Sequence, residues 1–110
     1  MNMYDKSKML REKYLNDIDY EVKLSILSQI VSAEFRNNDS LPHIITITFN
    51  TKIILKMNRK WRNSDNVYLT YPLEVLMQVL DDLDLSYDFY SYCQCSAFTY
   101  SFEVKFCNPW

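Results

Sequence analysis

The sequence predicts an α+β domain in which an antiparallel sheet of about four strands packs in two layers against two, or three, helices, in the order α-β-β-α-β-β. Three observations predict this class. Two long segments carry apolar residues at helical spacing, other segments alternate apolar and polar residues, and short polar stretches separate them. A length of 110 residues fits a single domain spanning 1–110.

The first helical region runs from about Ser7 to Arg36, with a break expected near residues 16–19. There Asp17 or Asp19 is suited to cap the second helix of the pair, because a short acidic side chain accepts hydrogen bonds from the first free N–H groups. Beyond the break, helical spacing is shown by Leu24, Leu27, Ile30, Val31 and Phe35. Residues 37–42 contain Asn, Asp, Ser and Pro, which end the helix.

Residues 43–57 contain two alternating runs, which predict a β-hairpin. The phase of the alternation favours a three-residue loop, Asn50 to Lys52, because a two-residue loop would place lysines on the core face. That loop pairs Phe49 with Ile53. A single long bent strand over the same residues is the alternative.

The second half predicts one helix and a strand pair. A short strand over 67–70 precedes a helix that starts at Tyr71-Pro72, since proline suits the first helical turn. Its buried stripe is Leu73, Leu76, Met77, Leu80 and Leu83, widened by Val75 and Val79. Residues 87–92 and 98–106 form two strands that pair antiparallel through a turn within 94–97.

The absence of glycine excludes several kinds of functional site. A phosphate-binding P-loop, a dinucleotide-binding turn and a nucleophile elbow all require glycine, for positive φ or for close backbone approach. The one histidine, His43, begins a strand, and adjacent carboxylates on a helix diverge by about 100°. We therefore expect neither enzyme activity nor a cofactor.

The cysteines allow two interpretations. Cys93, Cys95 and Cys107 could join His43 in a Cys₃His zinc site, although the C-x-C spacing is shorter than the usual gap between zinc ligands. The interpretation that we favour is three free thiols with no metal, because an odd number of cysteines forms no disulfide framework.

An acidic group lies where the second long helix should end, at Asp81, Asp82 and Asp84. Negative charge is unfavourable at a helix C-terminus. One explanation is a solvated helix end that stops early, near Leu80. The other is an acidic patch, continued by Asp88, that binds a basic partner.

A basic segment balances these acids and consists of Lys56, Arg59, Lys60, Trp61 and Arg62, preceded by Lys52. A tryptophan among cations can stack on nucleic-acid bases or anchor a protein interface. A solvated loop whose tryptophan covers the edge of the core is the simpler explanation. The formal net charge of −2 argues against direct nucleic-acid binding.

The last quarter of the chain is rich in aromatic residues, and we expect both faces of the sheet to be partly apolar. Tyr90 and Tyr92 should share one face with Asp88, and Tyr87 and Phe89 the other. Two predicted helices cannot cover both faces, so a partner or a second copy of the chain should cover one. The aromatic residues expected to bind it are Tyr87, Tyr90, Tyr92, Tyr100 and Trp110.

The expected function is that of a small protein-binding module without enzyme activity. Absent glycine and scarce alanine, beside abundant Asn, Ile, Lys and Tyr, indicate an AT-rich genome, as in many low-GC bacteria, their phages and some large viruses. With the small size of the chain, this favours a phage or mobile-element protein. Such a protein could inhibit a host protein or nucleoprotein, for example a CRISPR nuclease. The alternatives are a nucleic-acid-binding accessory protein and a homodimeric structural one. No apolar run is long enough for a membrane span or leader, so we expect a cytoplasmic protein, in the host cytoplasm if viral.

Overall fold

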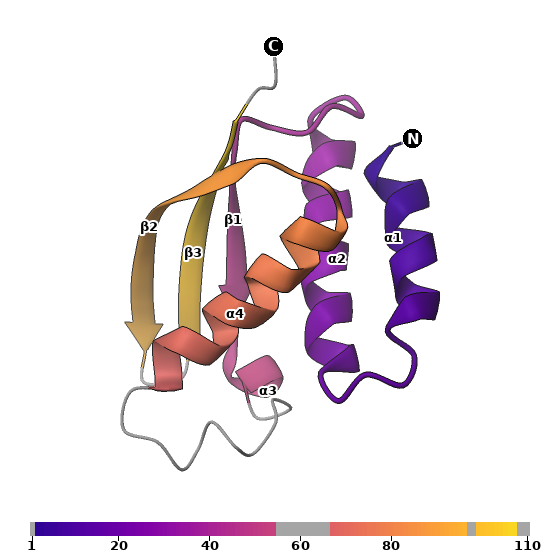
Figure 1. The fold of residues 1–110 in the computed structure, drawn as a ribbon. Coiled ribbons are helices and arrows are strands. Elements are labelled where there is room, and N and C mark those ends of the chain that lie inside the picture. Colours follow the sequence, from indigo (N-terminus) through magenta and orange to yellow (C-terminus); the bar gives the residue numbers. More distant parts are fainter. Residues whose placement is uncertain (1, 55–66, 97–98, 108–110) are drawn as a thin grey trace.

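The structure is a computed structural model that describes residues 2–54, 67–96 and 99–107 (Figure 1). Its elements, in chain order, are α1 (Met3–Lys13), α2 (Tyr20–Arg36), β1 (Ile44–Phe49), α3 (Thr51–Ile54), α4 (Val67–Asp82), β2 (Tyr87–Ser96) and β3 (Thr99–Phe106). The strands form one antiparallel sheet in the order β1-β3-β2. The predicted α+β class is confirmed, and the described residues contain three strands instead of about four.

The predicted second strand is replaced at its start by a helical turn, so both the hairpin and the single long strand are wrong for residues 51–54. The side chain of Asn50 accepts a hydrogen bond from the N–H of Ile53 at 2.9 Å. Asparagine is among the best residues for capping a helix in this way. The cap starts α3 directly after β1, and residues 55–57 of the predicted strand lie outside the described residues.

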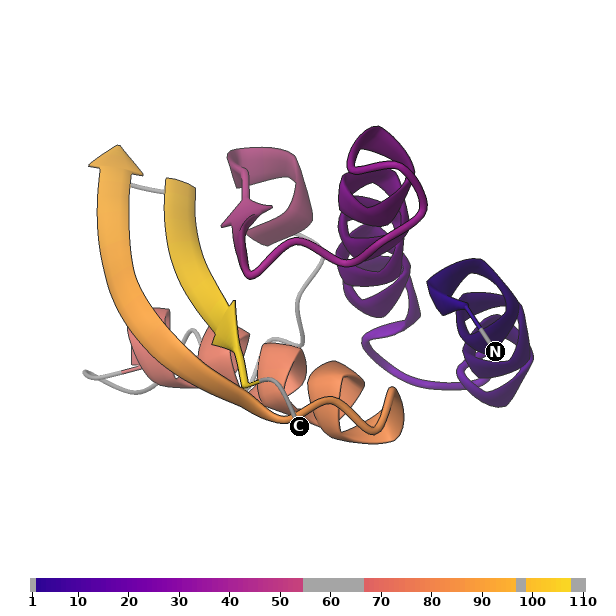
Figure 2. The ribbon, with the colours of Figure 1, turned by 90° about the horizontal axis from the view of Figure 1, so that it is seen from above.

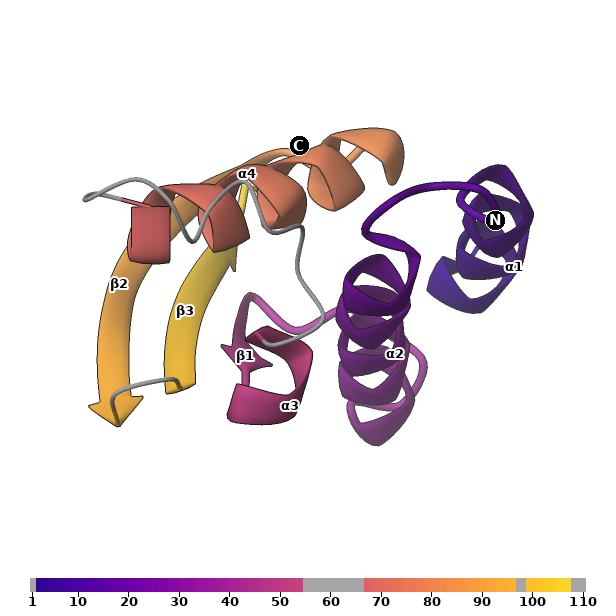
Figure 3. The same ribbon diagram turned by 90° about the horizontal axis from the view of Figure 1, so that it is seen from below.

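Helices α2 and α4 enclose the core with one face of the sheet. Helix α4 crosses that face diagonally, whereas α2 lies beside β1 (Figures 1 and 3). Helix α1 packs against α2 on the side away from the sheet, so the helices do not form one simple layer (Figure 2). No helix among the described residues is long and apolar enough to cross a membrane.

The register of the strands fills the core. Ile45, Ile47 and Phe49 of β1 are buried, and the predicted alternation of the last strand is confirmed from Tyr100 to Phe106. The ring of Phe102 makes edge contacts with those of Phe49, at 5.7 Å between centroids, and Phe89, at 6.4 Å. Edge-to-face contacts of this kind add to the free energy gained by burial.

Helix α4 begins at Val67, so residues 67–70 are helical and not a short strand. Pro72 lies inside the helix, where it removes one backbone hydrogen bond without ending the helix. The buried residues are Val75, Leu76, Val79, Leu80 and Leu83. The valines are therefore central to the stripe, and Met77 lies at its margin with 39% of its surface exposed.

The end of α4 has the hydrogen bonds of a Schellman motif. The N–H of Asp84 bonds to the carbonyl of Asp81 at 3.0 Å, and the N–H of Leu85 to that of Leu80 at 3.2 Å. This motif needs a left-handed residue, and Asp84 has φ 58°. The helix continues to Asp82, so the expectation that it stops near Leu80 is wrong.

Replacing Asp84 separately by glycine and alanine tests this helix end. Both changes remove the same carboxylate, but only glycine adopts positive φ without a steric penalty. We expect Asp84→Gly to be more stable than Asp84→Ala by about 1–2 kcal/mol in urea unfolding. Equal stability, or a more stable alanine variant, would contradict the left-handed geometry.

Candidate functional site

Two of the predicted acidic residues are engaged within the protein. Asp82 accepts hydrogen bonds from the hydroxyl of Tyr14 and from the ammonium of Lys13, the latter at 3.5 Å. Asp81 accepts one from the hydroxyl of Tyr87 at 3.0 Å. These contacts attach α1 and β2 to the end of α4, so Asp81 and Asp82 have a structural role.

The environment of these tyrosines keeps them protonated at neutral pH. Burial, and then the hydrogen bond and charge of Asp82, raise the pKa of Tyr14 far above its usual value. Burial and the hydrogen bond to Asp81 raise the pKa of Tyr87 to about 12. Both hydroxyls therefore remain hydrogen-bond donors to the carboxylates across the physiological range.

A buried cation joins α2 to the residues that connect it to α1. The side chain of Lys23 is 2% exposed, and its ammonium lies 2.7 Å from the carboxylate of Asp17. It also lies 4.7 Å from the centroid of the Tyr14 ring. Burial opposes ionisation of Asp17, but hydrogen bonds from Lys23 and the Asp19 N–H, with the charge of Lys23, lower its pKa below the usual value. Asp19 occupies the predicted N-cap position without a side-chain capping bond.

The remaining two acids, Asp84 and Asp88, are exposed, as is Asp81. Asp84 is the left-handed residue after α4. Asp88 is aligned with Lys105 across β2 and β3, and it accepts a hydrogen bond from the Cys107 thiol at 3.6 Å. Three of the four predicted acids, Asp81, Asp84 and Asp88, are therefore exposed, and their role as a partner-binding patch stays a prediction.

The aromatic residues expected to form one binding face differ in their burial. Tyr100 is 2% exposed and lies in the core, so its expected role in partner binding is wrong for this structure. Tyr87 is half-buried and packs against the core, whereas Tyr90 is 64% exposed. Trp110 lies outside the described residues.

A bulge in β2 changes the predicted phase of that strand. The register shifts between Phe89 and Ser91, after which Tyr92 is aligned with Phe102, a residue of the buried face. Asp88 is aligned with Lys105, a residue of the opposite face. Tyr92 and Asp88 therefore do not share a face at their register positions, because an extra residue reverses the alternation.

The outer face of the sheet is mainly polar, contrary to the expectation of two partly apolar faces. Thr48 and Ser101 contact each other there through their hydroxyls at 3.2 Å. Other residues at aligned outer positions include Ile44, Thr46, Glu103, Lys105, Asp88 and Ser91. Ile44 is the apolar residue of this group, and the exposed Tyr90 falls at the bulge of β2, outside the aligned positions.

Two predicted sites lie wholly or partly outside the described residues. The basic segment, from Lys56 to Arg62, is wholly outside them. His43 and Cys107 are exposed, and no group of three or more metal-binding side chains occurs among the described residues. The side chains of Cys93 and Cys95 are not among those described.

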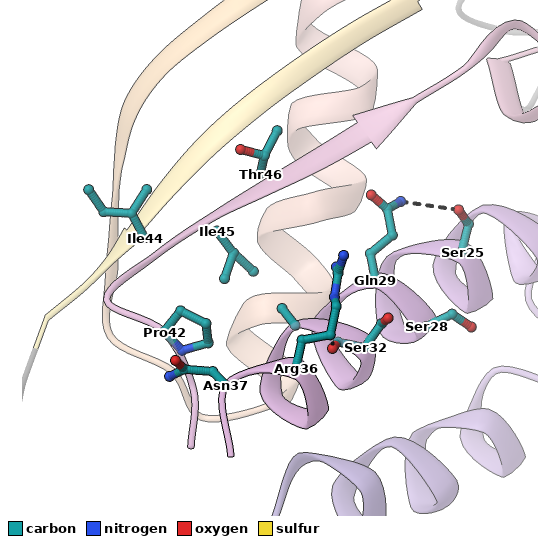
Figure 4. A pocket seen from close by; sticks show the side chains of 11 residues that line it. Ser25, Ser28, Gln29, Ser32, Arg36, Asn37, Pro42, Ile44, Ile45 and Thr46 are labelled. Carbon is teal, nitrogen blue, oxygen red and sulfur yellow. Dashed lines mark hydrogen bonds between the residues drawn. The ribbon is translucent and has the colours of Figure 1, made fainter. Parts of the chain in front are cut away.

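A groove that the sequence did not predict lies between α2 and the free edge of β1 (Figure 4). It has a volume of about 680 Å³. Its α2 wall carries Ser25, Gln29, Ser32 and Arg36, and its strand wall carries Ile44, Ile45 and Thr46. The wall residues of α2 recur at helical spacing, and this polar stripe is the signal in the sequence that could have indicated the groove.

The strand wall of the groove presents backbone hydrogen-bonding groups. In an antiparallel pair, alternate residues bond to the partner and the others point away. The N–H of Phe106 bonds to the carbonyl of His43 at 2.9 Å. With the observed register, Ile45, Ile47 and Phe49 then bond to β3, and the backbone groups of Ile44, Thr46 and Thr48 face away from it.

The side-chain amide of Gln29 hydrogen-bonds to both backbone groups that Thr48 presents at the edge of β1. Its side-chain oxygen accepts from the Thr48 N–H at 2.8 Å, and its side-chain nitrogen donates to the Thr48 carbonyl at 2.9 Å. The amide also contacts the hydroxyl of Ser25 at 3.3 Å (Figure 4). The amide of Gln29 thus pairs with the strand as a neighbouring backbone would, and it leaves the edge groups of Ile44 and Thr46 facing the groove.

Comparisons of the chain with protein-family models, with curated proteins and with solved structures found no match.

Proposed function

We propose that the chain is a protein-binding module without enzyme activity, and that it binds an extended segment of a partner at the edge of β1. The observation that supports this most directly is the groove, in which two residues of the edge strand present backbone groups beside a polar helix face. An added strand gains affinity from main-chain hydrogen bonds and specificity from the side chains that line the groove.

The edge has the properties that strand addition requires. Proteins protect the exposed edge of a sheet by making the edge strand short, by placing charges on it or by covering it. Among the described residues, Gln29 is the side chain that bonds to this edge, and it does so at Thr48. At Thr46 the side chain is exposed and uncharged, so a segment can approach the backbone without displacing a charge.

We assign the partner to a larger host protein or nucleoprotein in the cytoplasm, and the chain to a phage or mobile-element antagonist of it. This assignment is supported by composition: absent glycine and abundant Asn, Ile, Lys and Tyr indicate an AT-rich genome. A small module can inhibit a larger protein by occupying one segment of it.

A matched pair of substitutions tests the binding surface. Peptides are first selected on the purified chain from displayed random libraries that present the random segment internally or at a free C-terminus. Ser32→Trp fills the groove, and Ser86→Trp adds the same side chain beside the exposed acids after α4. We expect Ser32→Trp to weaken binding of the selected peptides at least about tenfold by fluorescence anisotropy, with Ser86→Trp unchanged.

The opposite pattern, with binding lost in Ser86→Trp and kept in Ser32→Trp, would contradict the groove and assign binding to the acidic end of α4. Circular dichroism checks that both variants keep the fold.

The antagonist assignment has a separate test. The chain is expressed in host strains that each carry one defence system, CRISPR nucleases included, and the plating efficiency of a targeted phage is measured. We expect plating to recover in one strain with the unaltered chain and with Ser86→Trp, and not with Ser32→Trp. No recovery across the panel would contradict the antagonist assignment.

A further inference from the structure

The shape and charge of the groove indicate which part of a partner it accepts, and this inference depends on the proposed function. Within the part of the chain that the structure describes, the backbone groups of Ile44 and Thr46 at the β1 edge point away from β3 and have no backbone partner. At one end Gln29 joins α2 to Thr48, and at the other the connection from Asn37 to Pro42 joins α2 to β1. Along the strand, the open edge groups are therefore limited to Ile44 and Thr46.

The length of the open edge limits the segment that can pair with it. From Ile44 to Thr48, where Gln29 occupies the edge, the strand rises by about 14 Å, at about 3.4 Å per residue. Three or four residues of an added strand fit within that distance. A segment within a chain would have to enter and leave between Gln29 and the connection from Asn37 to Pro42, whereas a chain terminus has to enter once.

The charge of the groove distinguishes the two kinds of terminus. Arg36 is the one charged residue among those that line it, and no carboxylate is among them. Its side chain extends from α2 toward β1 (Figure 4), and its Nε donates to the Ser32 carbonyl at 3.3 Å. That bond orients the guanidinium while its terminal nitrogens stay available to a ligand, and a guanidinium binds a carboxylate through two parallel hydrogen bonds.

From these observations we infer that the groove binds the C-terminal segment of a partner protein, added as a strand to the edge of β1 with its α-carboxylate on Arg36. The backbone of the segment bonds to Ile44 and Thr46. An N-terminal segment is disfavoured, because its ammonium would lie beside the guanidinium.

The test uses one peptide selected from the free C-terminus library, synthesised as the free acid and as the C-terminal amide. Affinities are measured for the unaltered chain, for Arg36→Gln, and for Arg11→Gln, which removes an exposed arginine of α1 outside the groove. We expect amidation to weaken binding at least about tenfold. Arg36→Gln should weaken the free acid similarly and make the two peptides bind equally, and Arg11→Gln should leave the preference for the acid intact.

The outcomes separate this inference from the proposed function. Equal binding of acid and amide by the unaltered chain would overturn the carboxylate contact, and the groove would still stand if Ser32→Trp blocked both peptides. A preference for the acid that survives Arg36→Gln would also overturn it. Failure of both libraries to yield any peptide that Ser32→Trp blocks would contradict the inference and the proposed function together.

Discussion

The register of β1 on β3 is the constraint on which the rest of the structure depends. It directs Ile45, Ile47 and Phe49 into the core, where α2 and α4 cover them. The same register directs the backbone groups of the intervening residues away from β3, toward α2. A shift by one residue would expose the apolar side chains and turn the polar ones inward, at a cost of about 1.5–3 kcal/mol for each large residue exposed. The core and the groove are therefore consequences of one pairing.

The lack of glycine also shapes the chain. Left-handed backbone is needed after α2 and after α4, and it occurs at Asn38, Asp39 and Asp84. Asparagine and aspartate tolerate this conformation better than other residues with a side chain. The position of Asp84 among the acids thus has a backbone explanation, in addition to any role of its charge.

Local patterns predicted most of the elements. The break between α1 and α2, the buried alternation of β3 and the antiparallel pairing of β2 with β3 all follow from spacing and turn residues. The prediction of secondary structure failed at three places where a local feature departed from the pattern of apolar and polar residues. Asn50 capped a helical turn within an alternating run, Val67 began a helix ahead of Pro72, and a bulge after Phe89 reversed the phase of β2.

The candidate site was less predictable, because its contacts join distant parts of the sequence. Tyr14 meets Asp82 across 68 positions, and no local pattern indicates that this acid is engaged. Predicting the groove requires knowing that α2 lies along the β1 edge, and tertiary packing determines that position. The polar stripe on α2 is visible in the sequence, but in isolation it resembles the solvated face of any surface helix.

Amide hydrogen exchange along β1, measured residue by residue by NMR, tests the open edge most directly. We expect slow exchange at Ile45 and Ile47, which bond to β3, slow exchange at Thr48, which bonds to Gln29, and fast exchange at Thr46. In Gln29→Ala, Thr48 should become fast while Ile47, as the internal control, stays slow. Protection of Thr46 equal to that of Ile45 and Ile47, or a Thr48 that is unaffected by Gln29→Ala, would contradict the open edge on which the proposed binding depends.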